Sequence, residues 1–232
     1  MTVPYVLSLS QETHPQLEQD HSFVGGRPRV PPDAALPHCR LCGSQQAFFF
    51  QTAFPDDHEW RGTSVAVFAC VSCANEDRLI PEMLPGPLNG ADIPAGFLEA
   101  YQENFSLLVF RTRSAIVREY TERVRFRRLT REPVGEPALA FGSLGGLPSW
   151  VHEEERPASY AQQVAMTFLM QIQPGCEFHT VPGAPRQVEL GLDGKPTMAS
   201  RTHYELFLGN TTYLFGTQAG HAPAIYVLTQ VP

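Results

Sequence analysis

Four of the five cysteines in this 232-residue chain form two pairs, each with two residues between the thiols. Cys39 and Cys42 lie in the stretch PHCRLCG, and Cys70 and Cys73 lie in the stretch FACVSC. Two cysteines that flank a tight turn can both face one ion, and two such turns complete a tetrahedron of ligands. The spacing therefore predicts a structural zinc site of the ribbon or knuckle type in the N-terminal half.

Two alternatives for these cysteines remain open: four core thiols without metal, or a redox-active pair. A redox pair normally lies at a helix N-terminus in a β-α-β setting, and the sequence gives neither pair that setting. A site closed by four thiolates leaves no position for water or substrate, so the predicted zinc is architectural. The fifth cysteine, Cys176, has no neighbouring cysteine, and we expect a plain buried or partly exposed thiol.

Two runs of acidic residues beside a histidine are the other candidates for chemistry. DDHEW begins at Asp56, and WVHEEERP begins at Trp150. Neither has the second histidine of an HExxH zinc site, and successive carboxylates on one strand point in different directions. We therefore interpret both runs as acidic loops that contact a basic partner protein. The predicted contacts are Asp56, Asp57, Glu59, Glu153, Glu154 and Glu155.

A hydrolase-type enzyme that uses one of these His/Glu clusters is an alternative. The other histidines of the second half, His179, His203 and His221, are scattered, and nothing in their spacing requires a site. The chain has no G-x-S-x-G elbow, no phosphate-binding loop and no dinucleotide fingerprint. The sequence therefore favours a protein that is not an enzyme.

The charge is distributed unevenly along the chain. The net charge is -7, yet residues 111–131 carry eight arginines against only Glu119 and Glu122. The remainder is therefore more acidic than the net charge suggests, which argues against direct nucleic-acid binding and suits a basic partner. We interpret the arginine-rich segment as a solvated face with ion pairs such as Arg118–Glu122 and Glu119–Arg123.

The sequence also predicts a cytoplasmic protein. No apolar run approaches the roughly 20 residues of a membrane span. The N-terminus lacks the basic region and continuous apolar stretch of a signal peptide. In the cytoplasm, cysteines are normally reduced and available to a metal.

Three matches in the same order predict a diverged internal duplication. GGRP at 25–28 matches GGLP at 145–148, and FFFQ at 48–51 matches FLMQ at 168–171. After an insertion, SVAVFACVSC at 64–73 aligns with TTYLFGTQAG at 211–220. In this alignment the second half lacks the cysteines, and opposite them it has Ser159, Gln162, Thr217 and Gly220.

We expect an α+β, mainly β fold in which two diverged halves form one body. The predicted parts are an N-terminal extension (1–21), a zinc-bearing half (22–110), an arginine-rich connection (111–134) and a second half without metal ligands (135–232). Besides the matched segments, strands are expected at 106–110, 187–192, 203–208 and 224–230. Helical signals are fewer, at 94–104, 113–126 and 158–164.

These motifs resemble two related families. FVGGRP, the first CxxC, the strand ending at Gln51 and FACxxC resemble the N-terminal half of programmed cell death protein 2 and its relatives. GSLGGLPSW followed by MTFLMQI resembles the bacterial YwqG-like family. The resemblance covers about residues 22–75 and 141–232. It implies zinc ligands at Cys39, Cys42, Cys70 and Cys73, and structural turns at Gly25, Gly26, Pro28, Gly145, Gly146, Pro148 and Trp150.

The resemblance also implies non-enzymatic protein binding. The eukaryotic relatives are similar to dedicated chaperones that hold a small-subunit ribosomal protein, and YwqG-like proteins are often proposed to be immunity proteins. We therefore expect a protein that sequesters one specific partner, with a bacterial toxin-immunity role as first choice. A dedicated chaperone for a basic ribosomal protein is the alternative.

Overall fold

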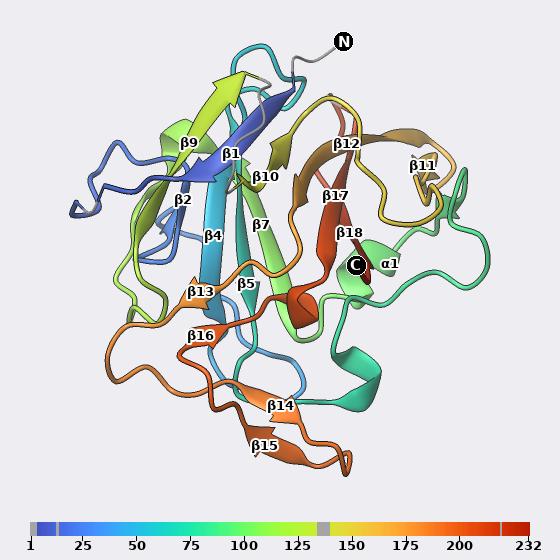
Figure 1. The fold of residues 1–232 in the computed structure, drawn as a ribbon. Helices are drawn as coiled ribbons and strands as arrows, with labels where there is room; N and C mark the ends of the chain where they lie inside the picture. The colour runs from blue at the N-terminus through green and yellow to red at the C-terminus, as the bar shows by residue number, and fades with distance from the viewer. Residues whose placement is uncertain (1–3, 13, 134–139, 219) are drawn as a thin grey trace.

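Twelve strands form one continuous sheet in the computed structural model, which describes residues 4–12, 14–133, 140–218 and 220–232 (Figure 1). Along its main path the strand order is β18-β17-β12-β10-β1-β9-β2-β4-β5-β7, and all these neighbours are antiparallel. These strands are β1 (Tyr5–Leu9), β2 (Phe23–Val24), β4 (Ala47–Ala53), β5 (Thr63–Ala69), β7 (Phe105–Arg111), β9 (Arg127–Pro133), β10 (Ala140–Leu144), β12 (Val164–Ile172), β17 (Thr211–Thr217) and β18 (Ile225–Gln230).

Short elements surround this path. β11 (Ser159–Tyr160) pairs with β12 and, in parallel, with β6 (Asp92–Ile93). Separate two-stranded pairs join β3 (Arg29–Val30) to β8 (Ile116–Val117), β13 (Phe178–His179) to β16 (His203–Tyr204), and β14 (Val188–Leu190) to β15 (Pro196–Met198). The helices are α1 (Phe97–Ala100) and three 3-10 turns at Glu76–Arg78, Thr112–Ser114 and Phe207–Gly209. The fold is therefore mainly β, as predicted.

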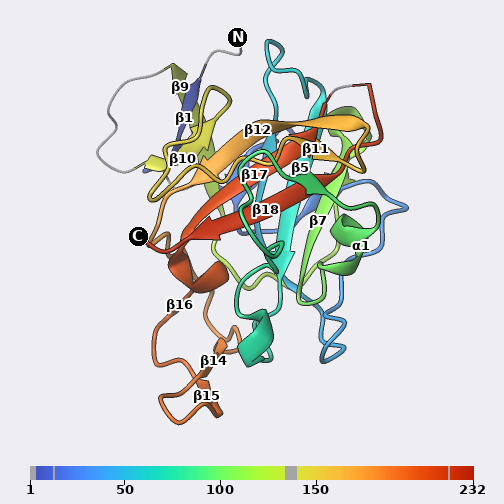
Figure 2. The same cartoon turned by 90° about the vertical axis from the view of Figure 1, so that its right-hand side faces the viewer.

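The sheet folds over so that its two ends face each other (Figures 1 and 2). Every residue of β4, β17 and β18 is buried, as expected for apolar strands that are covered on both faces. The Tyr101 hydroxyl, next to α1, donates to Ile225 O (3.0 Å) and accepts from Val227 N (3.0 Å). A single core cluster therefore includes residues from both ends of the sheet.

The two GGxP motifs make the same backbone contact in the two halves. Gly25 N donates to Phe49 O (2.9 Å), and Gly145 N donates to Leu169 O (2.9 Å). The first acceptor lies in a bulge between Phe48 and Phe50, and the second in a bulge of β12 between residues 168 and 170. Each bulge adds one unpaired residue to a strand, and here its carbonyl is satisfied by a motif glycine.

The two buried glutamines of the matched strands also have equivalent roles. Gln51 Oε1 accepts from Arg29 N (3.2 Å), and Gln171 Oε1 accepts from Ser149 N (2.8 Å). Both side chains are buried, and each accepts from the backbone N–H of the residue that follows its GGxP motif. The sheet register agrees with the sequence alignment as well, because β4 position 50 pairs with 67 and β12 position 170 pairs with 214.

The predicted helix at 113–126 is wrong, because after its first 3-10 turn this segment contains only the short strand β8, a single β-bridge at Val124 and irregular structure. The ion pairs predicted from helical spacing are likewise not found among the described residues; Glu122 instead faces Arg27 (3.7 Å). The arginines donate mainly to backbone carbonyls. Arg118 Nη1 bonds Pro31 O (2.6 Å), and Arg127 Nη2 bonds Ser10 O (2.6 Å). The segment thus joins the fold through side chains and contributes β9 to the sheet.

Other element boundaries also differ from expectation. The predicted helix at 94–104 is limited to α1, and the helical turn expected at 158–164 is β11 followed by a turn. The strand expected at 203–208 ends at Tyr204, because the chain enters a 3-10 turn there. The predicted N-terminal extension contains β1, which lies between β9 and β10, and the boundary predicted at residue 135 lies outside the described residues. No helix in the described part of the chain has the length and apolar character needed to cross a bilayer.

Candidate metal centre and neighbouring sites

The two cysteine pairs converge on one point. Their sulfur atoms lie 3.8 Å apart for Cys39–Cys73, 3.6 Å for Cys42–Cys70 and 3.6 Å for Cys70–Cys73, and all four lie within 4.8 Å of one another. A tetrahedral ion with metal–sulfur bonds of about 2.3 Å separates its sulfurs by about 3.8 Å. A disulfide would need about 2.05 Å. The arrangement therefore fits a single four-coordinate ion, and these residues could hold a metal.

Local backbone contacts place the two cysteine turns side by side. Gly43 N donates to Cys39 O (2.8 Å) and closes the first turn, where the positive φ of +73° favours glycine. The chain just before β7 then holds both turns. Glu103 O accepts from Arg40 N (2.7 Å), and Asn104 O accepts from Cys70 N (2.7 Å).

Four thiolates at these separations would repel one another in the absence of a cation. Burial raises the pKa of Cys70 to about 11, and burial together with the neighbouring Cys70 raises the pKa of Cys73 still further. For Cys42, burial acts in the same direction, but hydrogen bonds from Ser44, Cys73 and Cys70 together outweigh it and lower the pKa to about 6. Crowded thiols resist joint ionisation, and a bound divalent ion removes this penalty by direct coordination.

Cys176 lies apart from the cluster, as predicted. Its thiol is partly buried and donates to Phe141 O (3.5 Å). Burial raises the pKa of Cys176 to about 11, so the neutral thiol dominates at neutral pH. Cys176 therefore serves as a matched control for the four clustered cysteines.

The six predicted partner contacts form two separate groups. Asp56, Asp57 and Glu59 lie in the β4–β5 loop, where the Tyr5 hydroxyl donates to Asp57 (3.0 Å). Glu59 lines a pocket that includes the last residue of β17. The other group, at 153–155, contacts Gln230, which pairs with the first residue of β17. The two acidic groups therefore lie toward opposite ends of β17.

A buried glutamine holds the second acidic loop. Gln230 Oε1 accepts from Val151 N (3.0 Å) and His152 N (3.2 Å). Its Nε2 donates to Glu153 O (2.9 Å) and to the Glu155 carboxylate (2.8 Å). Because Gln230 is itself buried in β18, the loop has a fixed backbone while the side chains of 153 and 154 stay exposed.

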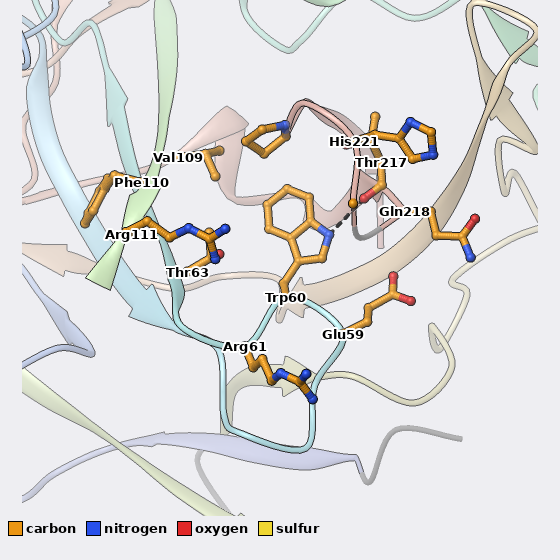
Figure 3. Close-up of a pocket in the computed structure, with 12 residues that line it drawn as sticks. Glu59, Trp60, Arg61, Thr63, Val109, Phe110, Arg111, Thr217, Gln218 and His221 are labelled. Carbon is orange, nitrogen blue, oxygen red and sulfur yellow. Dashed lines mark hydrogen bonds between the residues drawn. The ribbon is translucent and has the colours of Figure 1, made fainter. Parts of the chain in front are cut away.

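A pocket of about 320 Å³ lies between the β4–β5 loop and the β17–β18 turn (Figure 3). Trp60 forms its wall and donates from Nε1 to Thr217 O (2.9 Å). Arg61, Arg111 and His221 also line it. The sequence did not indicate this pocket, because its lining comes from segments that are distant along the chain.

Within the predicted exposed loop, His58 is buried. Its Nδ1 accepts from Trp60 N (3.0 Å), and its ring lies 4.7 Å from that of Phe54. Burial lowers the pKa of His58 to about 4, so the folded protein holds a neutral imidazole.

Stability should therefore fall as the pH is lowered from about 6.5 towards 4. In that range the unfolded chain binds a proton at His58 that the folded protein does not. The share of this histidine is about 2 kcal/mol after allowing for partial solvent screening. Urea unfolding at pH 7 and 4.5 measures it, and a His58→Gln variant should lose that part of the pH dependence. An equally steep dependence in the variant would contradict this assignment.

Two of the scattered histidines meet in the fold. His179 in β13 pairs directly with His203 in β16, and Glu177 lies next to both. The sequence missed this cluster because a short antiparallel pair brings together residues with no informative spacing. His221, the third candidate, lies at the pocket of Trp60 instead.

Comparison with models of known protein families gave no match, and comparison with curated protein sequences gave none either. The resemblance described from the sequence motifs therefore remains a prediction.

Proposed function

We propose that this protein is a zinc-stabilised, non-enzymatic binding protein that holds one basic protein partner through the acidic loop 151–155. The observation that carries this proposal is that four groups of the loop form hydrogen bonds with the side chain of Gln230. The Tyr213 hydroxyl donates to the same side chain and makes a fifth hydrogen bond. A loop whose backbone is already ordered loses little conformational entropy when a partner binds.

The surface beside this loop has the composition of a protein interface. Leu147 and Val231 are 81% and 62% exposed, and Val151 is 37% exposed. Glu153 and Glu154, which follow Val151 closely in the chain, are exposed as well. Apolar contacts with a polar border are typical of binding surfaces, and the carboxylates favour a partner with complementary positive charge.

The zinc assignment rests on the four sulfurs and their separations. Four thiolates at tetrahedral spacing match a closed structural zinc site, which adds its binding free energy to folding. Cys39 is only 2% exposed. The proposed ion therefore stabilises the turn at 39–43 against the end of β5, and leaves no coordination site for a substrate.

We also infer that the two halves arose by duplication. Their matched glycines, bulges and glutamines support this inference. At the two positions aligned with Cys39 and Cys42, hydrogen bonds stand in place of metal ligands, since the carboxylate of Asp92 from the first half accepts from Ser159 Oγ and from Gln162 N (2.7 Å). The second half thus needs no ion to close the equivalent turn, which supports a structural role for the metal.

A toxin domain held by a cytoplasmic immunity protein is the partner we propose first. A basic ribosomal protein, held as by a chaperone, is the second candidate, because it offers the same charge complementarity. Capture of the tagged protein with its partner from its own cells, followed by mass spectrometry, separates the two. Equimolar recovery of a toxin-like polypeptide supports the first candidate, and recovery of a ribosomal protein supports the second.

Charge reversal of the loop should then weaken binding. We expect the double variant Glu153→Lys, Glu154→Lys to bind the captured partner at least about tenfold less tightly, because two favourable interface charges become repulsive. The matched control is Asp33→Lys, Asp193→Lys, which makes the same change of net charge at exposed positions elsewhere. Equal affinities of the two double variants would contradict the proposed surface.

A further inference from the structure

The short pair β13–β16 places three metal-binding side chains on one surface. His179 and His203 are directly opposite each other in its register. Glu177 Oε2 lies 3.5 Å from His179 Nε2 and 3.6 Å from His203 Nδ1. One donor atom from each of the three residues lies within 4.8 Å of the others.

These separations are close to those that one ion would impose. Bonds of about 2.1 Å from a tetrahedral zinc ion to nitrogen or oxygen place neighbouring donors about 3.4 Å apart. The two imidazole rings are nearly perpendicular, at 87°, with centroids 6.0 Å apart. They are therefore not stacked on each other, and both rings present a nitrogen to the same carboxylate oxygen.

The remaining ring nitrogen of His203 faces a second carboxylate. His203 Nε2 lies 4.0 Å from Glu205 Oε1, while the other oxygen of Glu205 faces Arg201 (3.2 Å). This separation is longer than a hydrogen bond, so Glu205 acts on the site through its charge and leaves Nδ1 of His203 facing Glu177. Glu177 and Glu205 together also supply the negative charge that a divalent cation requires.

The backbone that carries these ligands is fixed by the core. Phe178 and Tyr204, the neighbours of the two histidines, are buried, and the Phe178 ring packs 4.8 Å from that of Phe49. His179 O accepts from Arg125 N (2.8 Å). Alternation along the strands then places the histidines on the opposite, outer face.

We propose that Glu177, His179 and His203 form a second metal site, selective for a divalent transition ion such as Zn²⁺. Imidazole and carboxylate donors suit such an ion, and three protein ligands leave one coordination position for water. Because Glu177 and His179 are about half exposed, the ion exchanges with solvent more readily than one enclosed by four thiolates. The site shares no residue with the cysteine cluster, and metal binding there does not require the proposed partner protein.

Calorimetric titration of the purified full-length protein with ZnCl2 tests the proposal. Wild-type protein should take up one equivalent of Zn²⁺ in addition to any metal it retains through purification. His179→Ala should lose this equivalent, and Glu205→Gln should weaken it more modestly, because it removes a nearby negative charge and no ligand. The matched control His221→Ala removes a histidine outside the cluster and should bind as wild type does.

Two results would overturn the assignment. One is a wild-type protein that takes up no additional equivalent. The other is a His179→Ala variant that binds as tightly as His221→Ala. Because His179 is exposed, its replacement should leave the fold intact, and circular dichroism of the variant checks this.

Discussion

Replacing Cys70 with serine is expected to abolish binding of the proposed zinc ion and to unfold the cysteine-bearing half of the protein. Cys70 lies within 3.6 Å of both Cys42 and Cys73, so its loss leaves an incomplete and crowded set of thiols. Structural zinc contributes about 10 kcal/mol or more of binding free energy that is available only to the folded state. A domain has a total stability of only about 5–15 kcal/mol.

Metal content by elemental mass spectrometry, together with urea unfolding, measures this effect. Cys176→Ser should retain the ion with little loss of stability, because that thiol lies outside the cluster. Should Cys70→Ser fail to accumulate, Cys42→Ser gives the same test at the exposed ligand. Undiminished metal content in either cluster variant would refute the four-thiolate site.

Gly25→Ala is expected to cost about 2–5 kcal/mol of unfolding free energy. Gly25 has a φ of +61°, and an added Cβ would lie 2.3 Å from Arg125 O and 2.5 Å from Val124 O. The left-handed conformation accounts for about 1–2 kcal/mol, and the collision with rigid backbone adds about 1–3 kcal/mol. To avoid this collision, the chain would have to move the end of β2 away from the 124–125 segment. That movement would disturb the hydrogen bond from Gly25 N to Phe49 O in the bulge.

Gly194→Ala is the matched control for this prediction. Its φ is +73°, but nothing lies within 4 Å of the added Cβ, so only the conformational cost of about 1–2 kcal/mol applies. Urea unfolding of both variants at one pH gives the difference directly. Equal destabilisation of the two would mean that the 124–125 backbone yields to the added methyl group.

The features that could be predicted from the sequence are those encoded by nearby residues. The two CxxC turns were recognisable because each pair closes its own turn, and β4 was recognisable as a continuous apolar run. The matched motifs also gave the correct relative register of β4–β5 and β12–β17. Local sequence specifies these elements, and the packing of the sheet then agrees with it.

Features that depend on distant partners were missed or wrong. The charges of the arginine-rich segment have helical spacing. In the fold, however, Arg118 and Arg127 donate to backbone carbonyls that are distant along the chain, and the segment is not helical beyond its first 3-10 turn. The pairing of His179 with His203 likewise arises from a tertiary arrangement. Tertiary contacts override local propensity in such segments, and the spacing of residues along the chain does not indicate these contacts.

The central position of β1 affects the order in which the fold can form during synthesis. Its neighbours β9 and β10 begin at residues 127 and 140, so β1 has no complete strand partner until more than 120 further residues have been synthesised. By residue 111, however, β2, β4, β5, β7 and both cysteine pairs have been made. Pairing between distant strands is slow because loop closure costs entropy. An ion held by the cysteines would therefore fix the early half as a template, onto which the first strand and the second half later assemble.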